Sequence, residues 1–211
     1  MRDLPAARSG HVTFGSFNNF CKINGQVLDV WTQILRAVEG SRLMLLTKSG
    51  SHRKWAAHFL RERGIAPERL AFHDYLPAAE GRAQGDFLHR YEQIDIALDT
   101  FPYNGMTTTC DALWMGVPVV SLVGLVSLGR AGLSLLSNVG LPELAVNSPE
   151  EYVRAAVQLA HDLPGLAALR ATLRGRMATS PLLDAGQLAR HVEAAYRTMW
   201  RRWCEKDAGG T

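Results

Sequence analysis

The sequence predicts an α/β domain in which helices flank a parallel β-sheet and a helical tail follows the sheet. Short apolar runs rich in β-formers alternate with stretches of helical period through most of the chain. Strands that are joined in this way by crossover helices run parallel. The remainder, after residue 149, has helical periodicity alone. A chain of 211 residues with 47% hydrophobic content can bury one good core.

The elements of the sheet can be placed in order along the first part of the chain. We expect strands at His11–Phe17, Arg42–Thr47, Arg69–His73, Ile94–Leu98 and Val117–Leu122. The intervening helices are expected at Gln26–Val38, His52–Arg63, Gly85–Glu92, Thr107–Met115 and Arg130–Val139. The sheet core therefore covers residues 11–146.

The tail, residues 149–204, is predicted to contain three helices. Pro149 follows Ser148 and precedes two glutamates, which is typical of a helix start. Breaks at LPG and TSPLLD separate the helices, which we place at Pro149–His161, Pro164–Met177 and Ala185–Trp203. Because nothing in the pattern marks a second domain, we predict that residues 1–211 form a single lobe.

Composition argues against several classes of protein. The formal net charge of +3 and the pI of about 8.9 are too small for a protein whose main partner is nucleic acid. The three cysteines are far apart and lack CxxC spacing, so neither a disulfide framework nor a thiolate metal site is indicated. No apolar run has the length of a signal peptide or a membrane span. We therefore expect a cytoplasmic protein that has no membrane partner.

Common catalytic motifs are also missing from the sequence. It contains no GxxxxGK[ST] and no GxGxxG, which argues against a P-loop nucleotidase and an ordinary dinucleotide enzyme. The histidines lack HExxH or comparable ligand spacing, and no GxSxG motif surrounds Ser134. Neither a histidine metal site nor a hydrolase is indicated.

The loop after Leu98 is the strongest candidate for a ligand site. In an open parallel sheet, ligands bind beyond the carboxyl ends of the strands. The sequence DTFPYNGMTTTCD forms a turn there and then places Thr107, Thr108 and Thr109 where a helix should begin. A helix start offers unpaired N–H groups and partial positive charge to an anion such as phosphate. Asp111 lies about one turn further on, where a carboxylate could accept hydrogen bonds from sugar hydroxyls.

A structural alternative explains the same residues. Thr107 could act only as the cap of the helix, with Asp111 at the surface. The first strand, however, ends in a loop that carries Asn18, Asn19 and Lys22 to the same sheet edge. A lysine there can reach a diphosphate, and an asparagine can bind a base or a phosphate oxygen. This second set of residues favours the ligand-binding interpretation.

Taken together, these segments resemble a known family. The stretches FGSFNNFCKI, DIALDTFPYNGMTTTCDALWMGVPVV, LSLLSNVGLPEL, SPLLD and YRTMWRRWC resemble, in the same order, the C-terminal catalytic lobe of the O-GlcNAc transferase and SPINDLY family. The resemblance implies a GT-B architecture, in which two Rossmann-like lobes face each other. It also implies that the nucleotide-sugar donor lies mainly on the lobe that this chain supplies.

The resemblance assigns roles to individual residues. It implies that Asn19 and Lys22 contact the nucleotide and its diphosphate, and that Thr107 and Thr108 begin the phosphate-binding helix. The ribose hydroxyls are expected on Asp111.

The resemblance also assigns three further positions to the donor site. Two of them differ from the family pattern, and the third is a single arginine. Met106 stands where relatives have His, Gly or Thr. Phe87 aligns with a donor-contacting His, and it could stack on a base but has no proton to donate. Arg130 is the one donor carried over from the segment SLGRAG.

The implied reaction is protein O-glycosylation. The hydroxyl of a Ser or Thr in an acceptor protein would attack the anomeric carbon of UDP-GlcNAc with inversion. Lys22, as the catalytic residue, would act with the helix start and the threonine hydroxyls to stabilise charge on the leaving nucleoside diphosphate. Neither a metal nor another cofactor is then expected.

The resemblance also implies partners and leaves two alternatives open. The family has an N-terminal catalytic lobe and tetratricopeptide repeats, neither of which these 211 residues contain, so the isolated chain is expected to lack full activity. One alternative is a SPINDLY-type lobe that uses GDP-fucose. The other is a non-catalytic binding module that docks through Tyr196, Trp200 and Trp203 of the last helix.

Overall fold

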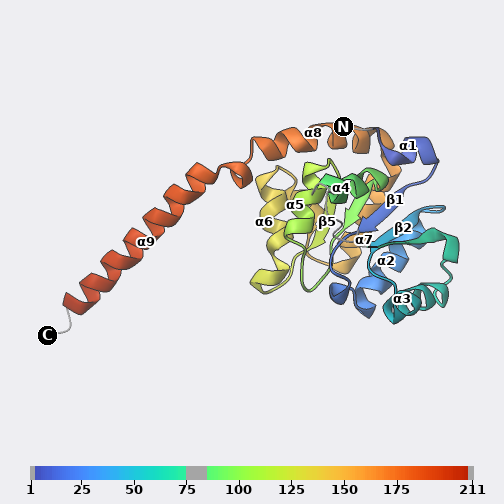
Figure 1. Cartoon of the computed structure of the whole chain (residues 1–211), viewed down its shortest axis with the longest axis horizontal. Helices are drawn as coiled ribbons and strands as arrows, with labels where there is room; N and C mark the ends of the chain where they lie inside the picture. Colours follow the sequence, from blue (N-terminus) through green and yellow to red (C-terminus); the bar gives the residue numbers. More distant parts are fainter. Residues whose placement is uncertain (1–2, 75–84, 209–211) are drawn as a thin grey trace.

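A single parallel sheet organises the molecule. The structure, a computed structural model, describes residues 3–74 and 85–208. Within these ranges six parallel strands lie in the order β3-β2-β1-β4-β5-β6 (Figure 1). Their bounds are β1 Thr13–Ser16, β2 Arg42–Leu46, β3 Leu70–His73, β4 Ile96–Leu98, β5 Val119–Leu122 and β6 Ala145–Val146. The predicted parallel α/β fold is confirmed.

Helices connect the strands and then form the tail. The α-helices are α1 Pro5–Ser9, α2 Gly25–Ala37, α3 Ser51–Arg61, α4 Gly85–Leu88, α5 Thr107–Trp114, α6 Ala131–Asn138, α7 Pro149–His161, α8 Leu163–Ala178 and α9 Ala185–Ala208. Short 3-10 helices are η1 Phe20–Lys22, η2 Pro67–Arg69, η3 His89–Gln93, η4 Ser127–Gly129, η5 Pro142–Leu144 and η6 Pro181–Leu183.

The core has two parts, one on each face of the sheet. On one face, α1, α2, α3 and α7 bury a cluster that contains Trp31 and Tyr152. On the other face, α5, α6, α8 and η3 bury a cluster around Tyr91, Leu113 and Leu136. Burial on both faces explains why the strands read as continuous apolar runs without alternation. It also leaves the ends of the strands as the place for polar loops.

The structure differs from the sequence prediction in three elements, β6, α4 with η3, and α1. The strand β6 was not predicted because it is only two residues long, which is too short for a recognisable apolar run. The predicted helix Gly85–Glu92 is instead α4 followed by the 3-10 helix η3. Helix α1 was missed because tertiary contacts, and not its own periodicity, hold it. The buried carboxylate of Asp95 accepts hydrogen bonds from Ala6 N (2.9 Å) and Thr13 N (2.8 Å) and so ties α1 to the sheet.

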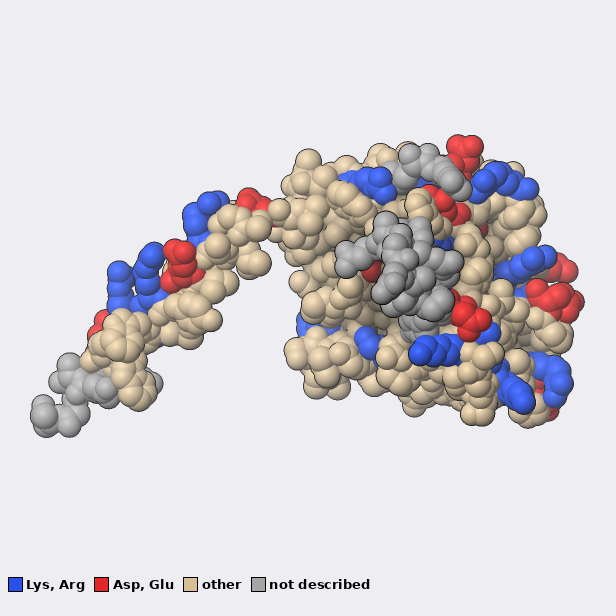
Figure 2. All heavy atoms as spheres, in the orientation of Figure 1, with Lys and Arg blue, Asp and Glu red and all other residues tan. Residues whose placement is uncertain are grey.

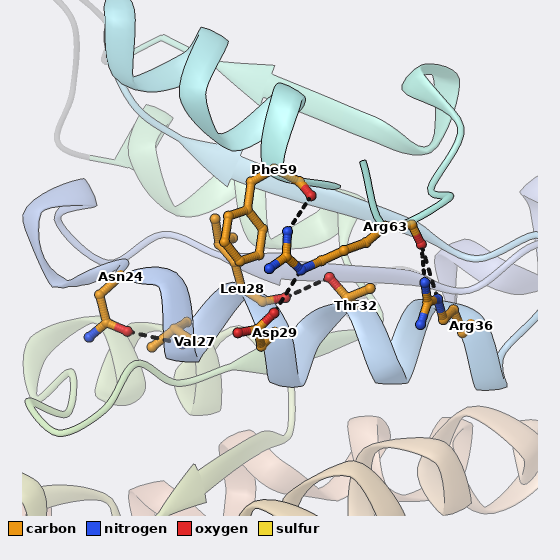
Figure 3. Close-up of polar contacts among 8 residues, drawn as sticks. All are labelled: Asn24, Val27, Leu28, Asp29, Thr32, Arg36, Phe59 and Arg63. Carbon is orange, nitrogen blue, oxygen red and sulfur yellow. Dashed lines mark hydrogen bonds and ion pairs between the residues drawn. The ribbon is translucent and has the colours of Figure 1, made fainter. Parts of the chain in front are cut away.

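The start of α2 is fixed by one asparagine. Asn24 Oδ1 accepts a hydrogen bond from Val27 N at 3.0 Å and caps the helix (Figure 3). The same amide donates from Nδ2 to Phe101 O at 3.2 Å. Asn24 therefore links the β1–α2 connection to the turn that follows β4, which are the two loops where we expect the ligand.

The packing of α2 against α3 uses an arginine at the end of α3. The Arg63 guanidinium lies 3.5 Å from the centre of the Phe59 ring and donates to Asp29 Oδ1 at 2.7 Å. Arg36 in turn donates from Nε to Arg63 O at 3.0 Å (Figure 3). These groups lie at the partly exposed contact between α2 and α3, where the Arg63 and Asp29 side chains are 35% and 52% exposed.

The tail follows the prediction closely at α7 and diverges at its end. Ser148 caps α7 by accepting a hydrogen bond from Glu151 N at 3.2 Å, and Pro149 is the first helical residue. Helix α9 projects away from the rest of the molecule (Figure 1). Among residues 3–74 and 85–208, no helix combines the length and the apolar character that crossing a membrane requires.

Candidate functional site

Three neighbouring strands end side by side at the candidate site. β1, β4 and β5 are adjacent in the sheet and parallel, so the loops after them meet at one edge. A cleft of about 450 Å³ opens there. Its lining residues come from the loops after β1, β4 and β5 and from the starts of α5 and α6: Asn18, Asn19, Lys22, Tyr103, Asn104, Met106, Thr107, Thr108, Ser127, Leu128 and Ala131. Six of these residues were singled out from the sequence: Asn18, Asn19, Lys22, Met106, Thr107 and Thr108.

Lys22 is held in place by the turn after β4. It ends the 3-10 helix η1, which Asn19 caps by accepting a hydrogen bond from Cys21 N at 3.2 Å. The Lys22 ammonium donates to Asn104 O at 3.0 Å and lies 3.8 Å from the centre of the Tyr103 ring. A cation–π contact and a hydrogen bond together reduce the side-chain freedom that a ligand would otherwise have to freeze. The cation is therefore preorganised at the cleft.

The start of α5 lacks a side-chain cap. The residue at the cap position is Met106, and no side-chain hydrogen bond closes the helix start. Thr107 is the first helical residue and does not cap the helix, which removes that part of the structural alternative. The first N–H groups of a helix have no partner within it, and they carry partial positive charge. Together with Lys22, this helix start gives the cleft the character of an anion site.

The side chains of the three threonines at the start of α5, Thr107, Thr108 and Thr109, have different roles. Thr108 Oγ1 donates to Asn18 Oδ1 at 2.8 Å, and Thr109 Oγ1 donates to Gly105 O at 2.8 Å. The hydroxyl protons of Thr108 and Thr109 are thus directed to protein acceptors. Thr107 is exposed, and it lines the cleft. Of the two threonines predicted to bind, Thr107 can donate a hydroxyl to a ligand and Thr108 chiefly supports the loop.

A buried carboxylate lies beneath the cleft. Asp99, one residue beyond β4, is 1% exposed. Its Oδ1 accepts from Gly105 N (2.7 Å), Thr100 N (2.9 Å) and Asn18 Nδ2 (3.2 Å), and its Oδ2 accepts from Ser121 Oγ (2.7 Å). Burial raises the pKa of this carboxyl to about 6, while the four hydrogen bonds oppose the rise. Asp99 was not among the site residues predicted from the sequence, although an acidic residue directly after the buried run IDIAL was a usable signal.

Two predicted residues, Phe87 and Asp111, lie near Tyr91. Tyr91 donates from its hydroxyl to Thr108 O at 3.1 Å, and its ring packs against Phe87 with centroids 6.1 Å apart. Burial raises the pKa of Tyr91, and the nearby Asp111 carboxylate raises it further. Asp111 is half-buried, and burial raises its own pKa as well. Phe87 and Asp111 are therefore neighbours of Tyr91, and they are not among the residues that line the cleft.

Arg130 lies near the cleft without lining it. It follows η4 and precedes α6, and it donates from Nη1 to Gly124 O at 3.3 Å. Its neighbours Leu128 and Ala131 do reach the cleft. The exposed Met106 side chain lies at the opening, where it adds an apolar rim.

Sequence reasoning missed several lining residues. Tyr103, Asn104, Ser127, Leu128 and Ala131 belong to loops whose conformation the sequence pattern does not fix. For Asn104, a signal existed in the turn sequence PYNG, but its partners could not be foreseen: its Nδ2 donates to Thr100 O (3.0 Å) and Leu122 O (3.2 Å). Within the described residues, no group of three or more His, Cys, Asp or Glu side chains is placed to hold a metal ion. The expectation of a metal-free site stays a prediction.

The order of the strands defines the class of the protein. A parallel sheet with the order 3-2-1-4-5-6 and helices on both faces is a doubly wound, Rossmann-like domain. Among models of protein families, the one described as glycosyl transferase family 41 matches residues 3–192. The chain therefore belongs to glycosyl transferase family 41, in agreement with the resemblance found in the sequence.

Individual relatives agree with this assignment. The chain is 45% identical over 206 residues to a tomato (Solanum lycopersicum) protein described as a probable UDP-N-acetylglucosamine–peptide N-acetylglucosaminyltransferase SPINDLY, covering 96% of this chain and 22% of the relative. It is 33% identical over 192 residues to the UDP-N-acetylglucosamine–peptide N-acetylglucosaminyltransferase of Caenorhabditis elegans, covering 91% of this chain and 16% of the relative. The chain thus spans about a fifth of the length of such relatives.

Solved structures agree with the fold. A mutant of Thermobaculum terrenum O-GlcNAc transferase superposes with a TM-score of 0.86 and 41% identity, over 98% of this chain and 39% of that one. Anabaena HepE in complex with UDP and glucose superposes with a TM-score of 0.61 over 90% of this chain and 51% of its own. At 13% identity the second match supports the fold alone. The expected GT-B type of lobe is confirmed.

Two matched substitutions test whether Thr108 has a structural role that Thr107 lacks. Thr108→Val keeps the shape of the side chain but leaves Asn18 Oδ1 without its hydroxyl donor. We expect the free energy of unfolding to fall by about 0.5 to 1.5 kcal/mol, the usual value of one such hydrogen bond. Thr107→Val, at the exposed neighbouring position, is the control and should change it by less than about 0.5 kcal/mol. Urea unfolding measures both, and equal losses in the two variants would contradict the assignment.

Proposed function

We propose that this chain is the nucleotide-sugar-binding lobe of an inverting O-linked protein glycosyltransferase. The observation that carries the proposal is the pairing of Lys22 with the uncapped start of α5 on one cleft. A fixed cation and the first N–H groups of a helix suit a diphosphate, which carries the negative charge of UDP- and GDP-sugar donors. Membership of family 41 supports a sugar transfer, as opposed to another use of such a site.

In the proposed reaction the lobe acts on the leaving group. The hydroxyl of an acceptor Ser or Thr attacks the anomeric carbon and gives its proton to a base of the N-terminal catalytic lobe, the bond from that carbon to the diphosphate oxygen breaks, and the configuration inverts. Negative charge then grows on the nucleoside diphosphate. Lys22 and the N–H groups of α5, already oriented, stabilise that charge without reorganisation. Asn19 and Thr107 add donors at the same cleft, and no metal or other cofactor is required.

The remaining predicted residues would bind the nucleoside. Asp111 and Phe87 lie together around Tyr91, which is joined to α5 through Thr108 O. We assign the ribose hydroxyls to Asp111 and base stacking to Phe87. Arg130 and Met106 flank the cleft and would meet the sugar end of the donor.

The donor is proposed to be UDP-GlcNAc, with GDP-fucose as the alternative. The tomato and C. elegans relatives are both described as transferases that use UDP-N-acetylglucosamine. GDP-fucose is the alternative donor because a SPINDLY-type lobe is expected to use it. The identity of this chain to the SPINDLY relatives is higher than its identity to the C. elegans relative. We propose that the lobe works in the cytoplasm, where the free thiols of Cys21, Cys110 and Cys204 would stay reduced.

Calorimetric titration with four ligands tests the donor. We expect UDP and UDP-GlcNAc to bind and GDP and GDP-fucose to bind at least about tenfold more weakly, which corresponds to roughly 1.4 kcal/mol of base recognition. The reverse order would select the GDP-fucose alternative. Absence of heat with all four ligands would refute nucleotide-sugar binding altogether.

The role of Lys22 predicts a specific loss of affinity. Lys22→Ala removes a charge-assisted hydrogen bond to the diphosphate, which should weaken UDP binding by about 1.5 to 3 kcal/mol, or roughly 10- to 150-fold. Lys54→Ala, on the exposed face of α3, is the control of equal charge change. Melting curves should show that both variants remain folded. If Lys22→Ala binds UDP as tightly as the wild type, the lysine has no part in the site.

The proposed enzyme needs a second lobe and a protein acceptor. Helix α9 carries apolar side chains that are all exposed, namely Leu188, Val192, Tyr196, Met199, Trp200 and Trp203. Figure 2 shows the charged groups of α9 gathered along one side, with uncharged residues along the other. A helix with such a face is stable when it packs on another apolar surface. We propose that an N-terminal catalytic lobe, with its tetratricopeptide repeats, supplies that surface.

If a second lobe is required, the isolated chain should bind the nucleotide-sugar donor without transferring the sugar. The isolated chain should bind the donor, yet transfer of labelled GlcNAc to a Ser/Thr peptide should not exceed that of the Lys22→Ala variant. The physical reason is that the acceptor hydroxyl would have no protein group to orient or deprotonate it. Transfer clearly above the variant would contradict the requirement for a second lobe. It would also rule out the alternative that the chain is a non-catalytic binding module.

A further inference from the structure

We propose that Asp99 is the positioning residue of the phosphate site, although its carboxylate does not line the cleft. The inference rests on the proposed function, because it explains how the binding groups are held. The carboxylate accepts hydrogen bonds from three separate segments at the sheet edge. These are the loop after β1 through Asn18, the turn after β4 through Thr100 and Gly105, and β5 through Ser121.

The first route from Asp99 to the cleft passes through Asn18. Asp99 Oδ1 accepts from the Nδ2 group of Asn18, which fixes the orientation of that amide and turns its Oδ1 toward Thr108. The Thr108 hydroxyl then donates to this oxygen at 2.8 Å. The loop that carries Lys22 is thereby latched to the first turn of α5. Asn18 itself lines the cleft, so any change in its orientation reaches the ligand directly.

The second route passes through the turn before α5. Gly105 N donates to Asp99 Oδ1 at 2.7 Å, and the residue before it, Asn104, provides the carbonyl that holds the Lys22 ammonium. A side chain at Gly105 would have no room, because a Cβ there would lie 2.2 Å from Thr108 Oγ1 and 2.3 Å from Asn18 Oδ1. The backbone of this turn therefore approaches the network closely. Asp99 sets where the turn lies, and the turn sets where the lysine and the helix start lie.

The arrangement requires an ionised carboxylate. An ionised carboxylate only accepts hydrogen bonds, and here Oδ1 accepts from three donors and Oδ2 from the Ser121 hydroxyl. Protonation removes the charge that strengthens all four hydrogen bonds and turns one of the oxygens into a donor. The groups that face Asp99 from neighbouring elements are uncharged: Asn18, Thr100, Gly105, Ser121 and the hydroxyl of Tyr152, whose pKa burial raises well above its ordinary value. Because the pKa of Asp99 is about 6, the network is complete at pH 8 and breaks as the pH falls through 6.

The ionisation of Asp99 changes the stability of the fold and the affinity for the ligand in opposite directions, so the two effects can be distinguished. A carboxyl whose pKa is raised on folding binds more protons in the native state, so its contribution to stability falls as the pH rises from about 4 to about 6. At pH 5 this group therefore favours the folded state. A loss of affinity at pH 5 cannot come from unfolding driven by Asp99.

The experiment is a pH series of donor titrations on the full chain. UDP-GlcNAc is the probe, replaced by GDP-fucose if the donor titration selects it. A nucleotide sugar is suitable because both of its phosphates are esterified and lack the ionisation near pH 6 that a terminal phosphate has. If only the ionised form binds, the competent fraction is about one tenth at pH 5, and the Kd should rise about tenfold from its value at pH 8.

Two variants and one control make the test specific. Asp99→Asn cannot ionise and should show one affinity from pH 5 to pH 8. Ser121→Ala removes a donor that lowers the pKa of Asp99, so the midpoint should move above that of the wild type. Ser134→Ala, an exposed serine on α6, should leave the midpoint unchanged. If Asp99→Asn does not fold, the shift in Ser121→Ala carries the test.

A ligand-free measurement separates this proposal from the proposed function. The amide proton of Gly105 donates to Asp99 Oδ1, so its NMR chemical shift should titrate with a midpoint near 6. If the shift titrates and no nucleotide binds at any pH, the proposed function fails and the latch still exists. If the donor binds equally at pH 5 and pH 8, or if Asp99→Asn keeps the wild-type pH step, Asp99 does not position the site.

Discussion

Four hydrogen bonds to one buried carboxylate determine the shape of the carboxyl edge of this sheet. Parallel strands bring β1, β4 and β5 to the same edge, but strand pairing alone does not fix the loops beyond them. Asp99 does so by accepting from one loop, one turn and one strand. Tyr152 adds a fourth connection, since its hydroxyl donates to Asp99 O at 2.8 Å from helix α7. The polar site is thus anchored in both the sheet and the helical layer behind it.

Much of this molecule could be predicted from local sequence, and the reasons are physical. The inner strands β1, β2, β4 and β5 are almost entirely buried and the edge strand β3 is half-buried, so each appears as an apolar run whatever its neighbours are. The start of α7 was evident because Ser148 and Pro149 act within a single turn. Lys22 and Thr107 could be placed at one edge because parallel strands must end there. None of these inferences required knowledge of a distant contact.

What escaped prediction depends on contacts between distant residues. Helix α1 and strand β6 are held by the sheet and have little periodicity of their own. Thr108 could be recognised as polar, but not as a donor to Asn18, which is 90 residues away. Asp99 lay in plain view at the end of a strand, yet its importance comes from partners in three separate segments. Sequence patterns report which side chains are available, and tertiary structure decides which of them face each other.

Because α9 projects from the molecule, its tryptophans are exposed to solvent and differ in fluorescence from the tryptophan in the core. Of the five tryptophans, Trp31 is fully buried, whereas Trp200 and Trp203 on α9 are 67% and 61% exposed. Indole emission moves to shorter wavelength when water is removed from the ring. The two α9 tryptophans therefore report on whatever covers this helix, while Trp31 reports on the integrity of the core. Intrinsic fluorescence can distinguish assembly from unfolding here without any added label.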